Sequence, residues 1–186
     1  MNNTEHSAQI GDNSRAGVGM GVVDGMEIHG YYHVQCHDAD GNLVWEDDIT
    51  NLVPTVGKNF TLDTVLAGSA YTAAWFMGLV DGASAPTFAA ADTAASHAGW
   101  TESTVYSNAT RPAPAFSAAA AGVKSTSSAV VFNINATGTI AGAFVISNNT
   151  KGGTTGTIYS EGSFSGGNQP VVNTNTLSVT YSSTLT

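Results

Sequence analysis

Residues 27–50, with the sequence EIHGYYHVQCHDADGNLVWEDDIT, predict a β-hairpin. Within Ile28–His37, apolar or small residues alternate with polar ones, so every second side chain faces the same, drier side of a strand. Asp38–Gly41 fits a tight turn in which the glycine adopts a positive φ. Leu43–Ile49 then returns as the second strand, and we expect Trp45 to lie at the edge of the core.

One helix and one buried strand follow the hairpin. Residues 55–66 are predicted to form the helix, which Thr55 can cap and Gly68 ends. The apolar residues of this helix point to more than one side of its axis, so we expect it to be largely covered. Residues 73–80 are almost all apolar, which is typical of a buried strand.

The remainder of the chain is predicted to be a loop and then a series of strands. Residues 81–103 form the loop, with one or two helical turns at Asp92–Gly99 and with Trp100 anchoring its exit. The later strands are separated by glycines. They are predicted at residues 104–107, 114–117, 129–135, 139–147, 157–162 and 176–182. Eight or nine short strands and one short helix predict a mainly β fold, a β-sandwich or jelly-roll-like domain.

The first 25 residues differ in composition from the rest of the chain. They contain five glycines and too few regularly spaced apolar residues to fold by themselves. We therefore expect residues 1–25 to form an extended N-terminal arm. The run Gly17–Gly21 lacks the glycine spacing and the preceding strand of a dinucleotide-binding loop. Residues 26–186 are expected to form a single β-sandwich domain.

The composition argues against several functional classes. Only 10% of residues are charged, and 5 basic against 14 acidic side chains give a net charge of −9. A chain with so few basic side chains cannot neutralise many phosphates. We therefore expect no nucleic-acid partner. No segment approaches the ~20 apolar residues of a membrane span, and we expect no secretion signal. The single cysteine, Cys36, excludes an internal disulfide and is expected to be buried and inert.

The charges are distributed unevenly along the chain. Residues 1–102 contain 13 acidic and 2 basic residues, a net charge of −11, whereas residues 103–186 contain 1 acidic and 3 basic residues, a net charge of +2. Two faces of opposite sign would favour the packing of one subunit on another. A solvated acidic end of the molecule explains the same distribution, and both alternatives stand.

Two groups of strand residues resemble metal or catalytic sites. His29, His33 and His37 lie four residues apart, which on a strand separates neighbouring rings by about 13 Å. We therefore expect a solvated strand face or a contact between subunits rather than a metal site. The acidic run Glu46–Asp48 alternates between the two faces of its strand, so paired carboxylates are not expected. Such runs are typical of an exposed sheet edge.

The hairpin turn resembles the start of a calcium-binding loop. Asp38, Asp40 and Asn42 have the ligand types of its first positions. The same frame requires Gly at its sixth position and Glu at its twelfth, where this chain has Leu43 and Ile49. A hairpin turn built from Asp and Gly is the simpler explanation.

Asp92, Ser96 and His97 have the residue types of a nucleophilic triad. No GxSxG motif surrounds any serine, and in a short helical turn Asp92 and His97 would not face each other. We expect roles at the ends of that turn instead. The sequence therefore predicts no enzyme activity and no catalytic, cofactor-binding or metal-binding residue.

Several short motifs together resemble a family of small structural proteins of tailed-bacteriophage virions. The most specific is Ser96–Glu102, with the sequence SHAGWTE. The others are Asp38–Trp45, Asn51–Val53 leading to Gly57, Gly78–Val80, Asp92–Thr93, Tyr106, Arg111–Pro112, Gly142–Phe144, Gly156–Gly162 with Phe164, and Thr176–Thr180. The resemblance covers residues 38 to 182 and implies a head-associated or other virion role. It departs from the family at Asn173–Asn175, where the family often has Gly-Asp before the last strand.

The first functional hypothesis is a capsid decoration, or cement, protein. Such a protein would bind the major capsid protein at capsomer junctions and pack against sister subunits, with a homo-oligomer, and most simply a trimer, expected. Residues 1–25 would become ordered on a neighbour. The localisation expected from this hypothesis is the virion, assembled in the host cytoplasm.

The alternative hypothesis is a tail or fibre component that contacts the host surface. In that case Tyr31, Trp75, Trp100 and Tyr106 could stack on sugars. Packing in the core is the competing explanation for these aromatic residues, and we favour it for Trp75 and Trp100.

Overall fold

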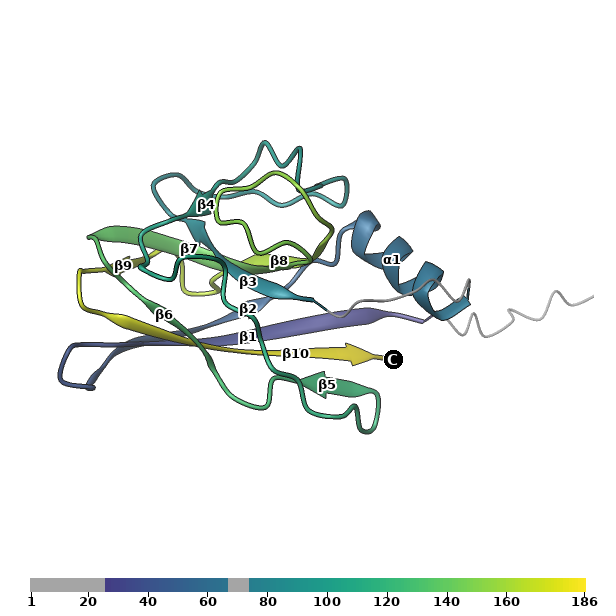
Figure 1. The fold of residues 1–186 in the computed structure, drawn as a ribbon, viewed down its shortest axis with the longest axis horizontal. Coiled ribbons are helices and arrows are strands. Elements are labelled where there is room, and N and C mark those ends of the chain that lie inside the picture. Colours follow the sequence, from purple (N-terminus) through teal and green to yellow (C-terminus); the bar gives the residue numbers. More distant parts are fainter. Residues whose placement is uncertain (1–25, 67–73) are drawn as a thin grey trace, which may run out of the picture.

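The computed structural model describes residues 26–66 and 74–186, which form two antiparallel sheets packed face to face with one helix beside them (Figure 1). The predicted mainly β fold of the sandwich type is therefore confirmed. The N-terminal arm predicted for residues 1–25 lies outside the described residues.

Sheet A has five strands in the order β2-β1-β10-β5, with β6 also paired to β10. Its strands are β1 (Ile28–His37), β2 (Leu43–Thr50), β5 (Val123–Ser125), β6 (Val130–Asn133) and β10 (Thr176–Leu185). β1 and β2 are the predicted hairpin, and Gly41 in its turn has the expected positive φ, 85°. The first and last strands pair along their whole length, from Ile28 opposite Leu185 to His37 opposite Thr176.

Sheet B has five strands in the order β4-β3-β7-β8, with β9 also paired to β7. Its strands are β3 (Phe76–Asp81), β4 (Glu102–Ser103), β7 (Gly138–Ile146), β8 (Ile158–Ser163) and β9 (Gln169–Val171). β3 confirms the predicted buried strand, although it begins at Phe76 rather than at residue 73.

The main core lies between the two sheets, and β3 and β7 are also covered on the opposite face. Met77 and Leu79 face the main core, whereas Val80 packs with Trp100 and Phe144 under the loop of residues 81–103. Strands covered on both sides cannot alternate apolar and polar residues, which explains the nearly continuous apolar run of β3.

Hydrogen bonds join the two sheets along both of their sides. On one side, the amides of Leu52 and Ser165 donate to the carbonyl groups of Glu161 and Asp48, at 2.7 and 2.8 Å. On the other side, residues 105–107 pair with the end of β6 and the residues after it. The sandwich is thus closed laterally.

The helix α1 (Thr55–Leu66) has the predicted bounds, but the expectation that it is largely covered was wrong. Leu62, Val65 and Leu66 are 43%, 73% and 78% exposed. The helix contacts β8 through its first turn, where the buried Gly57 lies against the backbone of β8. Its apolar residues surround the axis, so packing on one side leaves the others in solvent. Gly68, predicted to end it, lies outside the described residues.

The predicted helical turn at Asp92–Gly99 was also wrong. Thr93 and Ser96 exchange backbone hydrogen bonds of 2.9 and 3.0 Å, which form a tight turn. Asp92 does not cap a helix; its carboxylate accepts from the amide of Ala89 at 3.1 Å and from Nε1 of Trp100 at 3.3 Å.

Two further predicted strands, at residues 104–107 and 114–117, were wrong. Neither segment forms a strand. Each contains one isolated bridge, Tyr106 with Ile134 and Phe116 with Thr126, flanked by single backbone hydrogen bonds. The short strands β4, β5 and β9 were not predicted, and β4 lies within the predicted loop of residues 81–103. Each has two or three residues, which is too few to show a period of two.

The close approach of β7 and β8 predicts a test of the sheet packing. A Cβ atom added to Gly142 would overlap the carbonyl oxygen of Gly162 and lie 2.8 Å from Cα of Ser163. Gly142→Ala should therefore lower the free energy of unfolding by about 1–3 kcal/mol, measured by urea denaturation. Gly138→Ala on the same strand is the control, because its added Cβ would meet only Val105, at 3.4 Å. Equal stability of the two variants would contradict this packing.

Candidate interaction surfaces

One face of sheet A is open to solvent (Figure 1). It is formed by alternate residues of all five strands, since cross-strand partners share a face. We call it the outer face, and its residues are His29, Tyr31, His33, Gln35, His37, Glu46, Asp48, Thr50, Val123, Ser125, Val131, Asn133, Thr176, Ser178, Thr180, Ser182 and Thr184. None of these is a lysine or an arginine.

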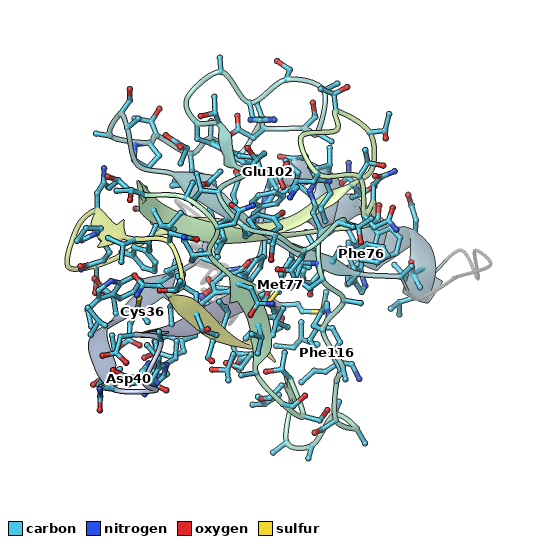
Figure 2. All side chains as sticks on the ribbon, turned by 60° about the vertical axis from the view of Figure 1, so that its left-hand side comes forward. Cys36, Asp40, Phe76, Met77, Glu102 and Phe116 are labelled. Atoms are coloured by element: carbon cyan, nitrogen blue, oxygen red, sulfur yellow. The ribbon has the colours of Figure 1, made fainter. Side chains whose placement is uncertain are left out.

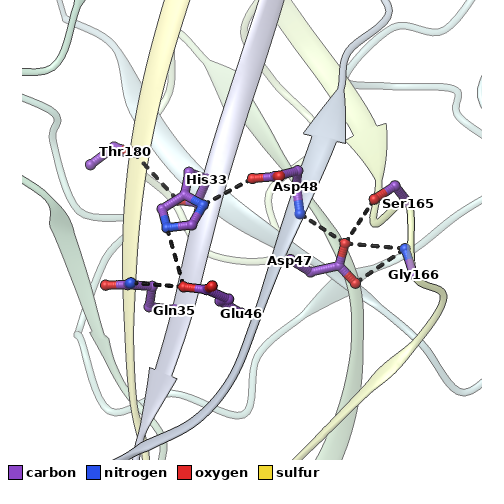
Figure 3. Close-up of polar contacts among 8 residues, drawn as sticks. All are labelled: His33, Gln35, Glu46, Asp47, Asp48, Ser165, Gly166 and Thr180. Carbon is purple, nitrogen blue, oxygen red and sulfur yellow. Dashed lines mark hydrogen bonds and ion pairs between the residues drawn. The ribbon is translucent and has the colours of Figure 1, made fainter.

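His33 lies beside two acidic residues of β2 on the outer face (Figure 3). Its Nδ1 is 2.9 Å from Oδ1 of Asp48, and its Nε2 is 3.8 Å from Oε2 of Glu46. Hydrogen bonds with Tyr31 and with His33 hold the pKa of Asp48 below its usual value. The three histidines share this face, and the described residues hold no group of three or more His, Cys, Asp or Glu side chains that could bind a metal ion.

Asp47 points to the opposite side of β2 from Glu46 and Asp48, as strand geometry predicts. Its carboxylate accepts hydrogen bonds from Ser165 Oγ at 3.0 Å and from the amide of Gly166 at 3.1 Å (Figure 3). The side chain of Gln169 donates a further bond of 2.9 Å. The acidic run lies on β2, which is the edge strand of sheet A, as expected for such a run. Asp47 in addition connects β2 to the segment after β8.

The carboxylate of Asp38 is engaged within the hairpin turn. It accepts from the amides of Asp40 and Asn42, at 2.9 and 2.8 Å, and from Nδ2 of Asn42 at 3.0 Å. These hydrogen bonds lower the pKa of Asp38. The geometry is that of an Asx turn, which is the predicted simpler explanation of this motif.

The residues considered as a nucleophilic triad gather around Trp100 instead. The ring of His97 stacks on that of Trp100 with centroids 4.0 Å apart, and His97 Nδ1 is 3.0 Å from the Trp100 carbonyl oxygen. Asp92 bonds to the indole of Trp100 from another side. Trp100 is 5% exposed. The SHAGWTE motif therefore fastens the 81–103 loop to sheet B.

A buried ion pair at the end of the same motif was not predicted. Arg111 is 2% exposed, and its Nη2 and Nε donate to the two carboxylate oxygens of Glu102, at 2.7 and 2.9 Å. Arg111 also donates to the carbonyl groups of Asn148 and Gly153, and its guanidinium lies 5.3 Å from the Phe144 ring centroid. We call Glu102 and Arg111 the ion-pair clasp. Both residues belong to the motifs of the resemblance, which is the signal that could have indicated the pair.

The three basic residues after position 103 do not form a positively charged face. Arg111 is neutralised in the ion-pair clasp, and Lys151 donates to the carbonyl groups of Tyr106 and Asn108. Lys124 lies apart from them and donates to the carbonyl of Ser117. The uneven charge therefore does not produce two faces of opposite sign. A solvated acidic region is the explanation that fits these contacts.

Glu161 on β8 is a buried carboxyl group that lies beside the carboxyl group of Asp92. It is 0% exposed, and none of the groups that shift its pKa is a cation. Burial, and then the neighbouring carboxylate of Asp92, raise the pKa of Glu161 to about 8. The group is therefore protonated at neutral pH, as a buried carboxyl without a cation must be. Cys36 is buried as predicted, and burial raises the pKa of its thiol to about 11.

The aromatic residues considered for sugar stacking differ in exposure. Trp100 and Tyr106 are 5% and 0% exposed, so they belong to the core. Trp75 is half-buried at the margin of the main core. Tyr31 is 44% exposed on the outer face.

An apolar cleft of about 910 Å³ opens at the end of the sandwich beside α1. Its walls come from α1, the ends of β1 and β10, β5 and the segment 113–122. Phe76 and Phe116 lie on this side of the molecule, away from the hairpin tip at Asp40 (Figure 2). Lys124 is the only charged residue among the described residues that line it. No sequence pattern indicated the cleft, because its walls come from segments distant in the sequence.

The sequence matches no protein-family model and no curated protein. No helix in residues 26–66 or 74–186 is long and apolar enough to cross a membrane. The class is therefore defined by the fold, a two-sheet antiparallel β-sandwich with one short helix. The outer face and the apolar cleft are the two surfaces of the described residues that could bind a partner.

The hydrogen bonds of Asp38 predict a calcium-independent role for the hairpin turn. Addition of EDTA or of calcium should leave the thermal midpoint of the protein unchanged. Asp38→Ala should lower that midpoint by the same amount with and without calcium, because the lost bonds are to the turn itself. A midpoint that falls by several degrees with EDTA only in the unmodified protein would restore the calcium loop.

The buried Glu161 predicts that stability falls as pH rises. Its pKa is about 8 in the folded protein and near 4.3 when unfolded. Between these values the folded state binds one proton more than the unfolded state. The free energy of unfolding should thus decrease by at most about 1.4 kcal/mol per pH unit from this group.

Glu161→Gln removes this titration, so its stability relative to the unmodified protein should increase from pH 5 to pH 8. Urea denaturation at several pH values measures the difference. Asp63→Asn, at an exposed position of α1, is the matched control and should show a constant difference. Parallel pH profiles for Glu161→Gln and the unmodified protein would contradict the assignment.

Proposed function

We propose that the chain is a bacteriophage virion structural protein that decorates the capsid and cements neighbouring capsomers. The outer face of sheet A carries this proposal. It is a broad sheet surface without basic residues, and most of its side chains are short and polar. Such a surface can be buried against another protein without removing many charges from water.

The composition of β10 favours burial of this face on a partner. Every outward-facing residue of the strand is a serine or threonine, namely Thr176, Ser178, Thr180, Ser182 and Thr184. These side chains lose little rotamer entropy when they become ordered, and each keeps a hydroxyl group that can bond across an interface. Tyr31 and Val131, which are 44% and 41% exposed, supply apolar contact area on the same face.

The hydrogen bonds and the buried ion pair within the domain suit a protein that must resist mechanical stress. The sandwich is joined laterally by backbone hydrogen bonds, and the ion-pair clasp fixes the loops over sheet B. A rigid domain loses little conformational entropy when it binds. Many copies on a capsid would act together, so each contact can be weak.

The resemblance to tailed-bacteriophage virion proteins supports the same proposal. The partners proposed are the major capsid protein and sister subunits, with a trimer at threefold or quasi-threefold positions. Residues 1–25 would contribute to attachment. A tail or fibre component that binds the host surface is the alternative, for which Tyr31 is the exposed aromatic residue among those considered.

The proposed role of the outer face predicts the effect of one substitution. Val131→Asp places a charge on this face and should weaken binding to empty phage heads at least tenfold, measured by co-sedimentation. Leu62→Asp on α1 is the matched control, since Leu62 is 43% exposed and Val131 is 41% exposed. Heads without the protein should assemble but rupture at a lower temperature.

Equal binding of the two variants would exclude the outer face as the attachment surface. Detection of the protein in a few copies at the tail, with loss of adsorption and unchanged heads in its absence, would favour the tail or fibre alternative.

A further inference from the structure

The apolar cleft concentrates exposed apolar surface at one end of the molecule. Val65 and Leu185, which line it, are 73% and 46% exposed. Met26, just before β1, is 56% exposed. Apolar surface gathered in this way is typical of a site that another segment or partner covers.

We propose that residues 18–22 of the same chain occupy this cleft. The first argument is position, because Glu27 pairs with Thr186 and Ile28 lines the cleft together with Leu185. The preceding residues thus enter the domain at the cleft itself. Residue 22 lies six positions before Ile28, which allows a reach of up to about 20 Å from the rim of the cleft.

The second argument is the pattern of residues 18–22, with the sequence VGMGV. In an extended conformation Val18, Met20 and Val22 project to one side and the two glycines to the other. An apolar row on a narrow backbone matches a cleft whose lining is mostly apolar. The glycine side would face solvent.

The third argument is the Asp24–Gly25 dipeptide, which lies between this segment and β1. Asp-Gly is among the strongest signals for a tight reversal between two extended segments. Such a reversal would direct residues 18–22 back over the domain. Asp24 would also approach Lys124, which among residues 26–66 and 74–186 is the one charged residue that lines the cleft.

Attachment to the same chain favours this occupant over a second copy. A segment held within reach of its site has an effective concentration in the millimolar range, which a separate subunit rarely attains. The part of the predicted arm next to the domain therefore stays with its own subunit, and residues 1–17 are left to contact a neighbour.

Disulfide trapping in the full chain tests the proposal. Met20→Cys is combined with Ala119→Cys or with Thr64→Cys, which lie on two different walls of the cleft. Mild oxidation should give an intramolecular disulfide, seen as a monomer without the two introduced thiols. Met20→Cys with Asp40→Cys, at the distant hairpin tip (Figure 2), is the control and should remain reduced. Native Cys36 is buried in every variant.

A covalent dimer of either cleft variant would overturn the proposal in favour of a second copy as the occupant. Absence of any disulfide in both cleft variants would overturn it altogether. A second measurement does not require a disulfide. Met20→Asp should increase the binding of an apolar fluorescent dye severalfold and lower the thermal midpoint by a few degrees, whereas Ser14→Asp should change neither. Equal behaviour of these two variants would count against the cleft as the docking site.

Discussion

The pairing of the first strand with the last is the constraint on which the rest of the structure depends. β1 and β10 pair in one uninterrupted register, with Val34 opposite Val179 at the centre. A shift of one residue would turn the apolar side chains of a strand to solvent. Once this pair is fixed, β2, β5 and β6 add to its sides and sheet B covers its inner face. The two strands are distant in the sequence, so the fold forms as a whole rather than in independent parts.

The chain has few charges, and its interior handles them in two ways. Arg111 is buried together with Glu102, and the remaining donors of the guanidinium reach backbone carbonyl groups. A buried pair of this kind is costly to break, because either partner alone would be an uncompensated charge. Glu161 has no cation beside it and is instead protonated at neutral pH. The Glu102–Arg111 pair fixes loops at any ordinary pH. The protonated Glu161 makes the domain more stable in mild acid.

These interior contacts leave two surfaces that the domain itself does not use. The outer face is polar and rigid because its strands are held by the sheet beneath it. The cleft is apolar, and the chain enters the domain at its rim. The SHAGWTE motif, Ser96–Glu102, lies at neither surface, since Trp100 and Glu102 hold loops over sheet B. These contacts give the motif a structural role in the fold.

Local sequence determined the elements that local physics can specify. The alternation in Ile28–His37, the Asp-Gly turn and the bounds of α1 were all predictable, because each depends on residues a few positions apart. The burial of β3 followed from its composition alone. Only the tertiary structure decided the exposure of α1, the short strands β4, β5 and β9, the contact of Arg111 with Glu102 and the cleft. Each of these depends on which distant segments meet. An apolar or charged residue in the sequence does not show whether another part of the chain covers it in the fold.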